Sequence, residues 1–330
     1  MEDETKTISK RPSCRILLTV FIILMVTVAA AMLTCYQLIY AEVYSRYIGV
    51  KNTSAEKVSK IIRGTEMNAN NVFDEVSMHL ENSEEVITAL KSKVKLNLDV
   101  RGYFAAFVPD YFPEKGTWFE PYIYQPEYGG FEYRQVGSAR HNYTKSPWYV
   151  QAKESGKSFW SEPYYYYDGT SISGHYTTFI KPLYNMKGDL ACVCGADMKF
   201  EWLAKELEWV DETSKNNKLL NKYKIFRDSK FYTIILNNDG ACIAHPEEKE
   251  INISDKEMLK DLAQNKNGVA TMSIDGETCM IFYGPIEFVN WSIAVIVPRS
   301  EIMKPMLTIA TLFSAMVALG MIIVWLVCKK

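Results

Sequence analysis

The chain carries one long apolar stretch near each end, residues 16–41 and 306–327, and neither stretch contains a charged side chain. A helix needs about 20 residues, at 1.5 Å each, to cross the hydrocarbon core of a bilayer. Both stretches exceed that length, so we predict two transmembrane helices. The long polar and aromatic segment between them is then held at a membrane by both of its ends.

The first stretch has an alternative interpretation as a secretory signal. Lys10, Arg11 and Arg15 precede it, and residues 29–31 are three alanines that offer a cleavage site. Its apolar run is longer than the 7–15 residues usual for a signal, which favours a membrane span.

Basic residues flank the first stretch on both sides and therefore do not orient it: Lys6, Lys10, Arg11 and Arg15 precede it, and Arg46, Lys51, Lys57 and Lys60 follow it. A segment as long as residues 42–305 is translocated largely regardless of its charge. We expect both short tails in the cytoplasm, two spans in the cell (inner) membrane, and an extracytoplasmic central segment. With a formal net charge of −2 and no basic block, nothing recommends a nucleic acid as a partner.

Apolar residues at helical spacing follow the first stretch and predict a long helix that rises from the membrane: Val58, Ile61, Ile62, Val72, Phe73, Val76, Leu80, Val86, Ile87 and Leu90. We expect a break in this helix near residues 81–83.

Aromatic-rich strands are predicted from Tyr103 onward. More than half of the aromatic residues of the chain lie between residues 101 and 180, so this part builds an aromatic core, a pocket wall, or both. Strands are expected at 175–183 and 190–196, joined by a turn at 185–189, and residues 197–203 are expected to be the first residues of a helix.

A second set of strands is predicted further along the chain. Residues 231–236 and 241–244 flank an Asn-Asp-Gly turn at 238–240, which favours a hairpin because glycine tolerates positive φ. Three more strands are expected at 269–274, 278–283 and 291–297, followed by a helix from residue 298. Each set ends in a buried strand and an acidic helix start, which indicates a structural repeat joined near residues 214–224.

The order and spacing of these residues resemble the double Cache extracytoplasmic sensor domain of bacterial transmembrane receptors. The resemblance covers roughly residues 45–303. In the first module it rests on Trp148-Tyr149, residues 160–164, Thr177 to Leu183 and Gly195-Ala196-Asp197, and in the second on residues 234–240 and 244–246. Residues 107–109 and 118–122 are most similar to receptors whose output is a serine phosphatase or a histidine kinase.

The expected fold class is therefore α+β: a long N-terminal helix with two tandem PAS-like (Cache) mixed α/β modules, flanked by two transmembrane helices. The resemblance implies that the modules carry two stacked mixed sheets. The expected segments are a cytoplasmic tail (1–15), a first span (16–41), a stalk helix region (42–100), a membrane-distal module (101–213), a membrane-proximal module (214–303), a second span (306–327) and a cytoplasmic tail (328–330).

The resemblance implies a small-molecule pocket in the distal module. By that likeness Trp148 and Tyr149 wall the pocket, Tyr167 and Asp168 lie on the loop that covers it, and Asp197 lies at its floor; Thr178 completes the predicted ligand-binding set. An aromatic wall with a few carboxylates also suits a ligand with an amine or several hydroxyls.

One departure from the family leaves the ligand open. Relatives that bind amino acids carry an arginine two residues before the Trp-Tyr pair to hold the α-carboxylate, and this chain has Ser146 there. Lys145 or Arg140 could replace it only as a less geometric contact.

Each predicted site residue also has a structural interpretation. Trp148, Tyr149 and Trp160 can simply be core residues. Only alternate rings of the four tyrosines at 164–167 can face inward from a strand. Asp197 can be the N-cap of the following helix rather than a ligand contact.

The cysteines and histidines suggest neither a disulfide framework nor a metal site. Cys192 and Cys194 are two apart in an apolar run, so we expect buried free thiols, and Cys242 with Cys279 is the one pair worth testing for a disulfide. Four histidines lack metal-ligand spacing: His79, His141, His175 and His245. No catalytic residues, metal or cofactor are predicted, and the chain is not expected to be an enzyme.

The predicted function is a membrane-anchored sensor that binds a small molecule in its distal module and transmits that state across the membrane. Because only three residues follow residue 327, we expect a separate output protein, unless the chain is the sensory part of something longer. A homodimer is expected to form through the stalk helix. A membrane-tethered binding or interaction module without signalling, and an extracytoplasmic enzyme, remain alternatives.

Overall fold

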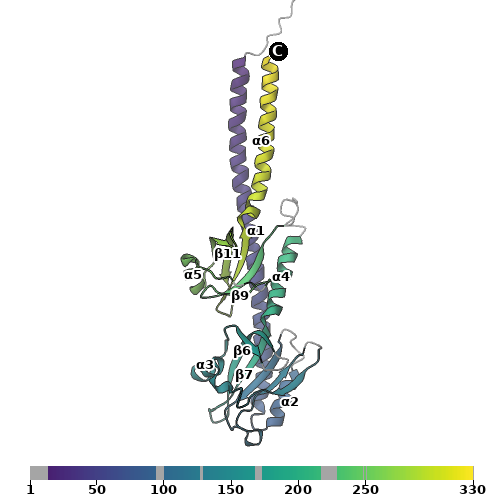
Figure 1. Cartoon of the computed structure of the whole chain (residues 1–330), viewed down its shortest axis with the longest axis vertical. Helices are drawn as coiled ribbons and strands as arrows, with labels where there is room; N and C mark the ends of the chain where they lie inside the picture. Colours follow the sequence, from purple (N-terminus) through teal and green to yellow (C-terminus); the bar gives the residue numbers. More distant parts are fainter. Residues whose placement is uncertain are drawn as a thin grey trace, which may run out of the picture.

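The computed structural model describes residues 14–93, 100–126, 129–167, 173–216, 229–247, 249 and 251–329. The molecule is elongated: two helices lie side by side at one end, a five-stranded sheet follows, and a seven-stranded sheet forms the other end (Figure 1). The helices and the antiparallel sheets confirm the α+β class.

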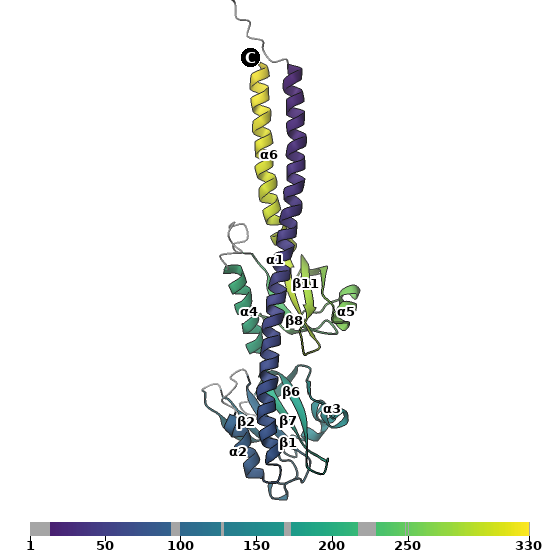
Figure 2. The ribbon, with the colours of Figure 1, turned by 180° about the vertical axis from the view of Figure 1, so that it is seen from behind.

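Helix α1 (Cys14–Met78) runs unbroken past both sheets (Figure 2). Its 65 residues span about 100 Å at 1.5 Å per residue. After a turn, α2 (Ser83–Lys93) begins, and the side-chain oxygen of Asn82 accepts hydrogen bonds from the backbone N–H groups of Glu84 and Glu85. This cap satisfies donors that have no partner within a helix and accounts for the predicted break.

The seven-stranded sheet contains β1 (Gly102–Phe107), β2 (Pro121–Tyr124), β3 (Glu132–Gln135), β4 (Phe159–Trp160), β5 (Tyr164–Tyr167), β6 (Ser173–Tyr184) and β7 (Leu190–Lys199). The order is β3-β2-β1-β7-β6-β4, and β5 pairs with β6. Helix α3 (Pro147–Ser155) and two short 3₁₀ turns, η2 (Pro113–Lys115) and η3 (Tyr143–Lys145), lie in the connections.

The two faces of this sheet have different partners, as the alternation of side chains along a strand requires. Tyr103, Ala105 and Phe107 of β1 pack in the core that includes α1 and α2. Phe104 and Ala106 belong instead to an aromatic core that includes α3. We call the seven-stranded sheet the distal sheet and the five-stranded sheet the proximal sheet, by their distance from the apolar ends of α1 and α6 (Figure 1). Helix α1 covers one face of the distal sheet, and α3 lies on the side of the other face.

The second sheet follows α4 (Phe200–Asn216) and contains β8 (Tyr232–Asn237), β9 (Cys242–Ala244), β10 (Gly268–Ile274), β11 (Glu277–Pro285) and β12 (Trp291–Pro298), with α5 (Lys256–Ala263) before β10. The order is β10-β11-β12-β8-β9. Asn237 accepts from the N–H groups of Asp239 and Ala241, which confirms the predicted turn between β8 and β9. Helix α6 (Arg299–Lys329) leaves β12 directly.

Two expectations about these modules are wrong. Every strand pairing among the described residues is antiparallel, so neither sheet is mixed. The helix expected to start at residues 197–203 begins only at Phe200, because Asp197, Met198 and Lys199 continue β7 in register with β6. Asp197 is therefore not a helix N-cap. The expected joint at 214–224 includes the last turn of α4 at 214–216, and the rest lies outside the described residues.

The cysteines whose side chains the structure describes are free thiols: Cys35, Cys192, Cys194, Cys242 and Cys279. Cys192 and Cys194 are buried on the same side of β7 with their Sγ atoms 3.8 Å apart, as their spacing predicted. Cys242 and Cys279 do not form a disulfide in this structure.

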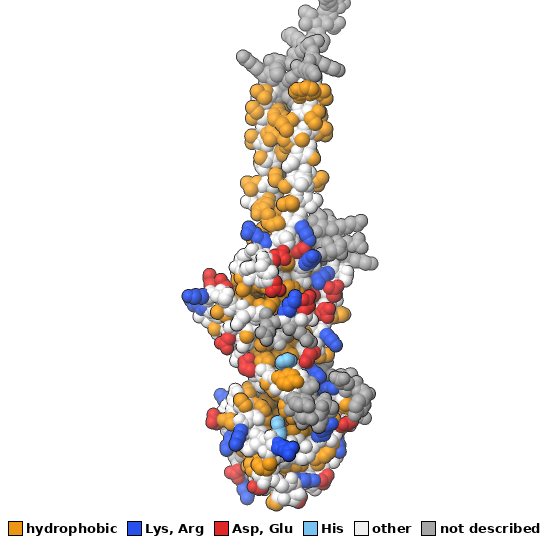
Figure 3. All heavy atoms as spheres, in the orientation of Figure 1, with side chains coloured by type: hydrophobic (Ala, Val, Ile, Leu, Met, Phe, Trp, Pro, Cys, Tyr) orange, Lys and Arg blue, Asp and Glu red, His pale blue; other side chains and the backbone are white. Residues whose placement is uncertain are grey.

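Two helices are long and apolar enough to cross a membrane, α1 in its N-terminal part and α6. Leu24, Leu33 and Leu319 each expose more than half of their side-chain surface there. Hydrophobic side chains dominate this end of the molecule, while the charged side chains visible in this view lie over the part that holds the two sheets, among side chains of other kinds (Figure 3). This distribution suggests a membrane-anchored chain.

Candidate functional site

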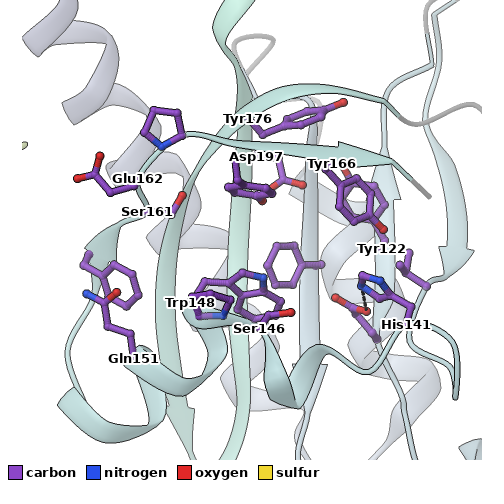
Figure 4. Close-up of a pocket in the computed structure, with 17 residues that line it drawn as sticks. Tyr122, His141, Ser146, Trp148, Gln151, Ser161, Glu162, Tyr166, Tyr176 and Asp197 are labelled. Atoms are coloured by element: carbon purple, nitrogen blue, oxygen red, sulfur yellow. Dashed lines mark hydrogen bonds and ion pairs between the residues drawn. The ribbon is translucent and has the colours of Figure 1, made fainter. Parts of the chain in front are cut away.

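A cavity of about 450 Å³ opens on the distal sheet, on the face turned away from α1. Residues of the sheet, of α3 and of the segment around β4 and β5 line it (Figure 4). Its volume is that of an ordinary small-molecule site. Seven of the lining residues carry aromatic rings: Phe104, Tyr122, Trp148, Phe159, Tyr164, Tyr166 and Tyr176.

Local sequence rules place these rings. Trp148 is in the first turn of α3, which starts at Pro147, a residue suited to that position because its φ is already helical. The Trp148 and Phe104 ring centroids are 5.1 Å apart. Tyr164 and Tyr166 line the cavity while Tyr165 between them is 63% exposed, which confirms the predicted alternation in β5.

Gly195 lets the floor of the cavity form. It lies opposite Phe104 in the β1–β7 pair, and a Cβ atom at this position would come within 2.2 Å of the Phe104 ring. The absence of a side chain therefore allows Phe104 to lie flat over β7. Asp197, two residues later, faces the same side of the strand and reaches the cavity.

Asp197 is a buried carboxylate held by hydroxyl groups. Its Oδ1 accepts hydrogen bonds from Thr178 Oγ1 at 2.7 Å and from the Tyr164 hydroxyl at 3.5 Å. Burial raises the pKa of Asp197 to about 6, and the hydroxyl hydrogen bonds limit that rise. A carboxyl with this pKa can change its charge near neutral pH.

Glu120 is a second buried carboxylate in the same cavity, only 4% exposed. Its Oε2 has no hydrogen-bond partner among the described residues, and the nearest cationic candidate, His141 Nε2, lies 3.7 Å away (Figure 4). Burial raises the pKa of Glu120 well above its ordinary value, and the charge of Asp197 adds to the rise. Burial lowers the pKa of His141, so this ring does not supply a full positive charge.

The predicted site residues have different positions. Trp148 and Asp197 line the cavity. Tyr149 is buried behind Trp148, against Tyr143, and is not among the lining residues. Thr178 is fully buried and acts on Asp197 through its hydroxyl.

The covering loop is only partly described. Tyr167 is the last residue of β5, and its side chain lies outside the described part of the chain. Asp168 lies outside it altogether. Their predicted contact with a ligand stays a prediction.

Sequence reasoning did not single out Glu120, His141, Tyr122 or Tyr176. One signal was present for Glu120: together with Tyr122 and Tyr124 it alternates along one face of the strand region, so it is a lone carboxylate in a row of inward rings. His141 had no such signal, because it lies in the connection between β3 and η3, where no strand or helix pattern predicts the direction of a side chain.

Within the part of the chain that the structure describes, no group of three or more His, Cys, Asp and Glu side chains could hold a metal ion. The polar groups that line the cavity are three carboxyl groups, one histidine, the Gln151 amide and hydroxyl groups, beside the aromatic faces.

Comparison with known proteins finds the Cache domain family over residues 49–306. The extracellular domain of the putative histidine kinase soHK1S-Z6 is 21% identical over 81% of this chain and 98% of that one, with a TM-score of 0.61. The periplasmic sensory domain of the Campylobacter jejuni chemoreceptor Tlp1 is 15% identical over 78% and 95%, with a TM-score of 0.62.

A third similar structure holds an amino acid. The ligand-binding domain of the Pseudomonas fluorescens chemoreceptor CtaA, in complex with L-isoleucine, is 16% identical over 82% of this chain and 98% of that one, with a TM-score of 0.54. At these identities the likeness shows the fold alone. A search of curated protein sequences finds no match.

We predict that Asp197→Asn stabilises the ligand-free protein at pH 7.5. Because the folded pKa of Asp197 is raised, ionisation destabilises the parent progressively from about pH 4 to about pH 6, by on the order of 2–3 kcal/mol in all. The amide keeps an acceptor for Thr178 and removes the buried charge. Thermal unfolding of the full chain across pH 4–8 measures the effect.

The gain should be largest above pH 6 and vanish near pH 4. The exposed Asp189, in the turn before β7, provides the matched control Asp189→Asn, which should change little at any pH. Equal destabilisation by Asp197→Asn at every pH would contradict this assignment.

Proposed function

Because this chain belongs to the Cache domain family, we propose that it is a membrane-anchored extracytoplasmic sensor that binds a small molecule in its membrane-distal module. We assign residues 101–213 to that module, 214–303 to the membrane-proximal one, and 42–100 to the stalk helix region. Residues 16–41 and 306–327 cross the membrane, with residues 1–15 and 328–330 in the cytoplasm. The central segment faces away from the cytoplasm at the inner membrane.

The observation that supports ligand binding best is the cavity on the distal sheet. Its wall is aromatic, and its few polar groups include two buried carboxyls, Glu120 and Asp197. Buried carboxyl groups without full pairing lower stability, so they are expected where function requires them. We propose that Trp148, Asp197 and the loop residues Tyr167 and Asp168 contact the ligand, with Thr178 and Tyr149 supporting them from behind.

Trp160 gives the cavity a physical connection to α1. Its neighbour Ser161 lines the cavity and accepts a hydrogen bond from the Thr178 N–H. The Trp160 indole N–H donates to Glu66 Oε1 on α1 at 2.7 Å, and its ring contacts Trp291 of the proximal sheet at a centroid distance of 6.3 Å. A ligand that favours one position of β4 would therefore favour one arrangement of α1 and both sheets.

A sensor of this kind requires a cytoplasmic output domain that responds to the bound ligand. The similar solved structures are sensor domains of a histidine kinase and of chemoreceptors. We propose that α1 and α6 pass the ligand state to a cytoplasmic output, on a separate protein or on a longer form of this chain, with dimerisation through the stalk. A tethered binding module without signalling would use the same cavity, but it would not require the Trp160 connection. No enzymatic activity is proposed, because the family is one of sensor domains.

The proposed function predicts that some small molecule stabilises the full chain in lipid nanodiscs. Pools of amino acids, amines, organic acids, purines and sugars are screened by thermal unfolding. A ligand at 100 times its Kd stabilises the native state by about 2.7 kcal/mol, which raises Tm by several degrees.

Trp148→Ala should abolish the shift because it removes one wall of the cavity. The matched control is Trp209→Ala, since Trp209 is 60% exposed on α4, away from the cavity. If no pool stabilises the folded chain, the small-molecule sensor is rejected.

We also predict that Trp160→Phe separates ligand binding from transmission. Phenylalanine keeps an aromatic ring against Phe179 and Trp291 but cannot donate to Glu66. The affinity for the compound selected in the screen should stay within about threefold of the parent, since Trp160 does not line the cavity. Hydrogen exchange should show that ligand protects α1 around Glu66 in the parent and much less in the variant. Equal protection in both proteins would disprove the connection.

A further inference from the structure

The charges that line the distal cavity are almost all of one sign. Three carboxylate residues face it, Glu120, Glu162 and Asp197, and among the described lining residues there is no lysine or arginine. The described lining of the cavity therefore offers negative charge and ring faces, and it contains no lysine or arginine cation.

The surroundings of Glu120 indicate which chemical group a ligand would have to supply. It is buried, its Oε2 has no hydrogen-bond partner among the described residues, and the neighbouring His141 is 3.7 Å away. A buried carboxylate of this kind is unfavourable unless a cation or donors compensate it. A ligand that brings a positive charge with N–H donors, or with a cationic methyl surface, would supply that compensation.

The surrounding rings suit the same ligand. The face of a tyrosine or tryptophan ring attracts a cation, and the attraction is larger in a site shielded from water. Tyr122, Trp148 and Tyr176 line the cavity that Asp197 reaches (Figure 4). Tyr164 also lines it and donates a hydrogen bond to Asp197. The carboxylates and the ring faces therefore both attract a cation.

The nearest basic side chains do not form a carboxylate clamp. Lys199 lies over the Tyr176 ring at 5.8 Å, Arg101 interacts with the Tyr176 hydroxyl, and neither lines the cavity. Ser146 lines it, whereas its neighbour Lys145 does not. An amino acid would bring a carboxylate into a cavity that already holds two buried carboxyls and no counter-ion, which is electrostatically unfavourable.

We propose that the ligand is a small organic cation without a carboxylate, an aliphatic, aromatic or quaternary amine, whose charged nitrogen lies between Glu120 and Asp197. This inference rests on the proposed function and specifies the ligand class of the same cavity. The space of about 450 Å³ admits an amine with a side chain as large as a phenyl ring.

Such binding is linked to protons. The titratable groups that face the two carboxyls are His141, Glu162, Tyr122, Tyr164, Tyr166 and Tyr176. Burial raises the pKa of both Asp197 and Glu120, so a cation that selects their ionised forms displaces protons. Affinity should therefore increase with pH, by about tenfold from pH 5 to pH 7 for Asp197 alone, given its pKa of about 6.

Calorimetry on the full chain in nanodiscs tests the inference with pairs of compounds that differ only by a carboxylate. Suitable pairs are phenethylamine and phenylalanine, isoamylamine and leucine, and putrescine and ornithine, with choline as a quaternary cation. At least one amine should bind ten or more times tighter than its amino acid. Glu120→Gln and Asp197→Asn should each weaken it at least tenfold and flatten the pH dependence. Glu257→Gln, on the exposed face of α5, should change neither.

The possible outcomes distinguish a failure of the organic-cation inference from a failure of the proposed sensor function. If an amino acid, sugar or purine binds through Trp148 and no amine does, the cation inference fails while the proposed function stands. If an amine binds but Glu120→Gln leaves its affinity and pH dependence unchanged, the role of Glu120 is rejected. If no compound of any class binds the folded chain, the proposed function fails and the inference fails with it.

Discussion

The packing of one helix against both sheets is the interaction on which the rest of the structure depends. Helix α1 contributes Val43, Tyr47 and Val50 to the core beside β11 and β12, Val58, Ile61 and Ile62 to the core between the modules, and Ala69, Val72, Phe73 and Val76 to the distal core. Each large apolar side chain buried this way contributes roughly 1.5–3 kcal/mol. Neither sheet can reposition freely without disturbing a core that α1 shares.

The distal sheet uses its two faces for opposite purposes. The face toward α1 is a dry core of rings and small residues, including Phe179, Cys192 and Cys194. The other face carries Asp197 on β7 and Glu120, which directly precedes β2. Burial of these two carboxyl groups does not favour the ligand-free fold. We propose that ligand recognition uses the face that carries the cavity, whereas the face toward α1 supplies the buried apolar core. Trp160, at the end of β4, packs against both the distal core and the core between the modules.

The regular elements were predictable because each follows from a local pattern. Helical spacing identified α1, and the Asn-Asp-Gly turn identified the β8–β9 hairpin. The prediction failed at Asp197 to Lys199, where pairing with β6 overrides local helix signals. At the site, Trp148 and Asp197 were recognisable, but Glu120 and His141 were not. They lie just before β2 and just after β3, and only the folded arrangement shows that both side chains reach the same cavity. Whether an aromatic ring lies in the core or lines the cavity also depends on the three-dimensional arrangement. Tyr149 is a core residue, whereas its neighbour Trp148 lines the cavity.

Because α1 shares a core with each sheet, we expect the two sheets to unfold as one cooperative unit. Native-state hydrogen exchange of the full chain in nanodiscs, at increasing denaturant below the unfolding midpoint, tests this most directly because it gives a free energy of opening for each segment. We predict that residues 43–78 of α1, together with β7 and β12, lose protection at the same denaturant concentration, with one common free energy of opening. Separate openings of β7 and β12, with α1 divided between them, would contradict it.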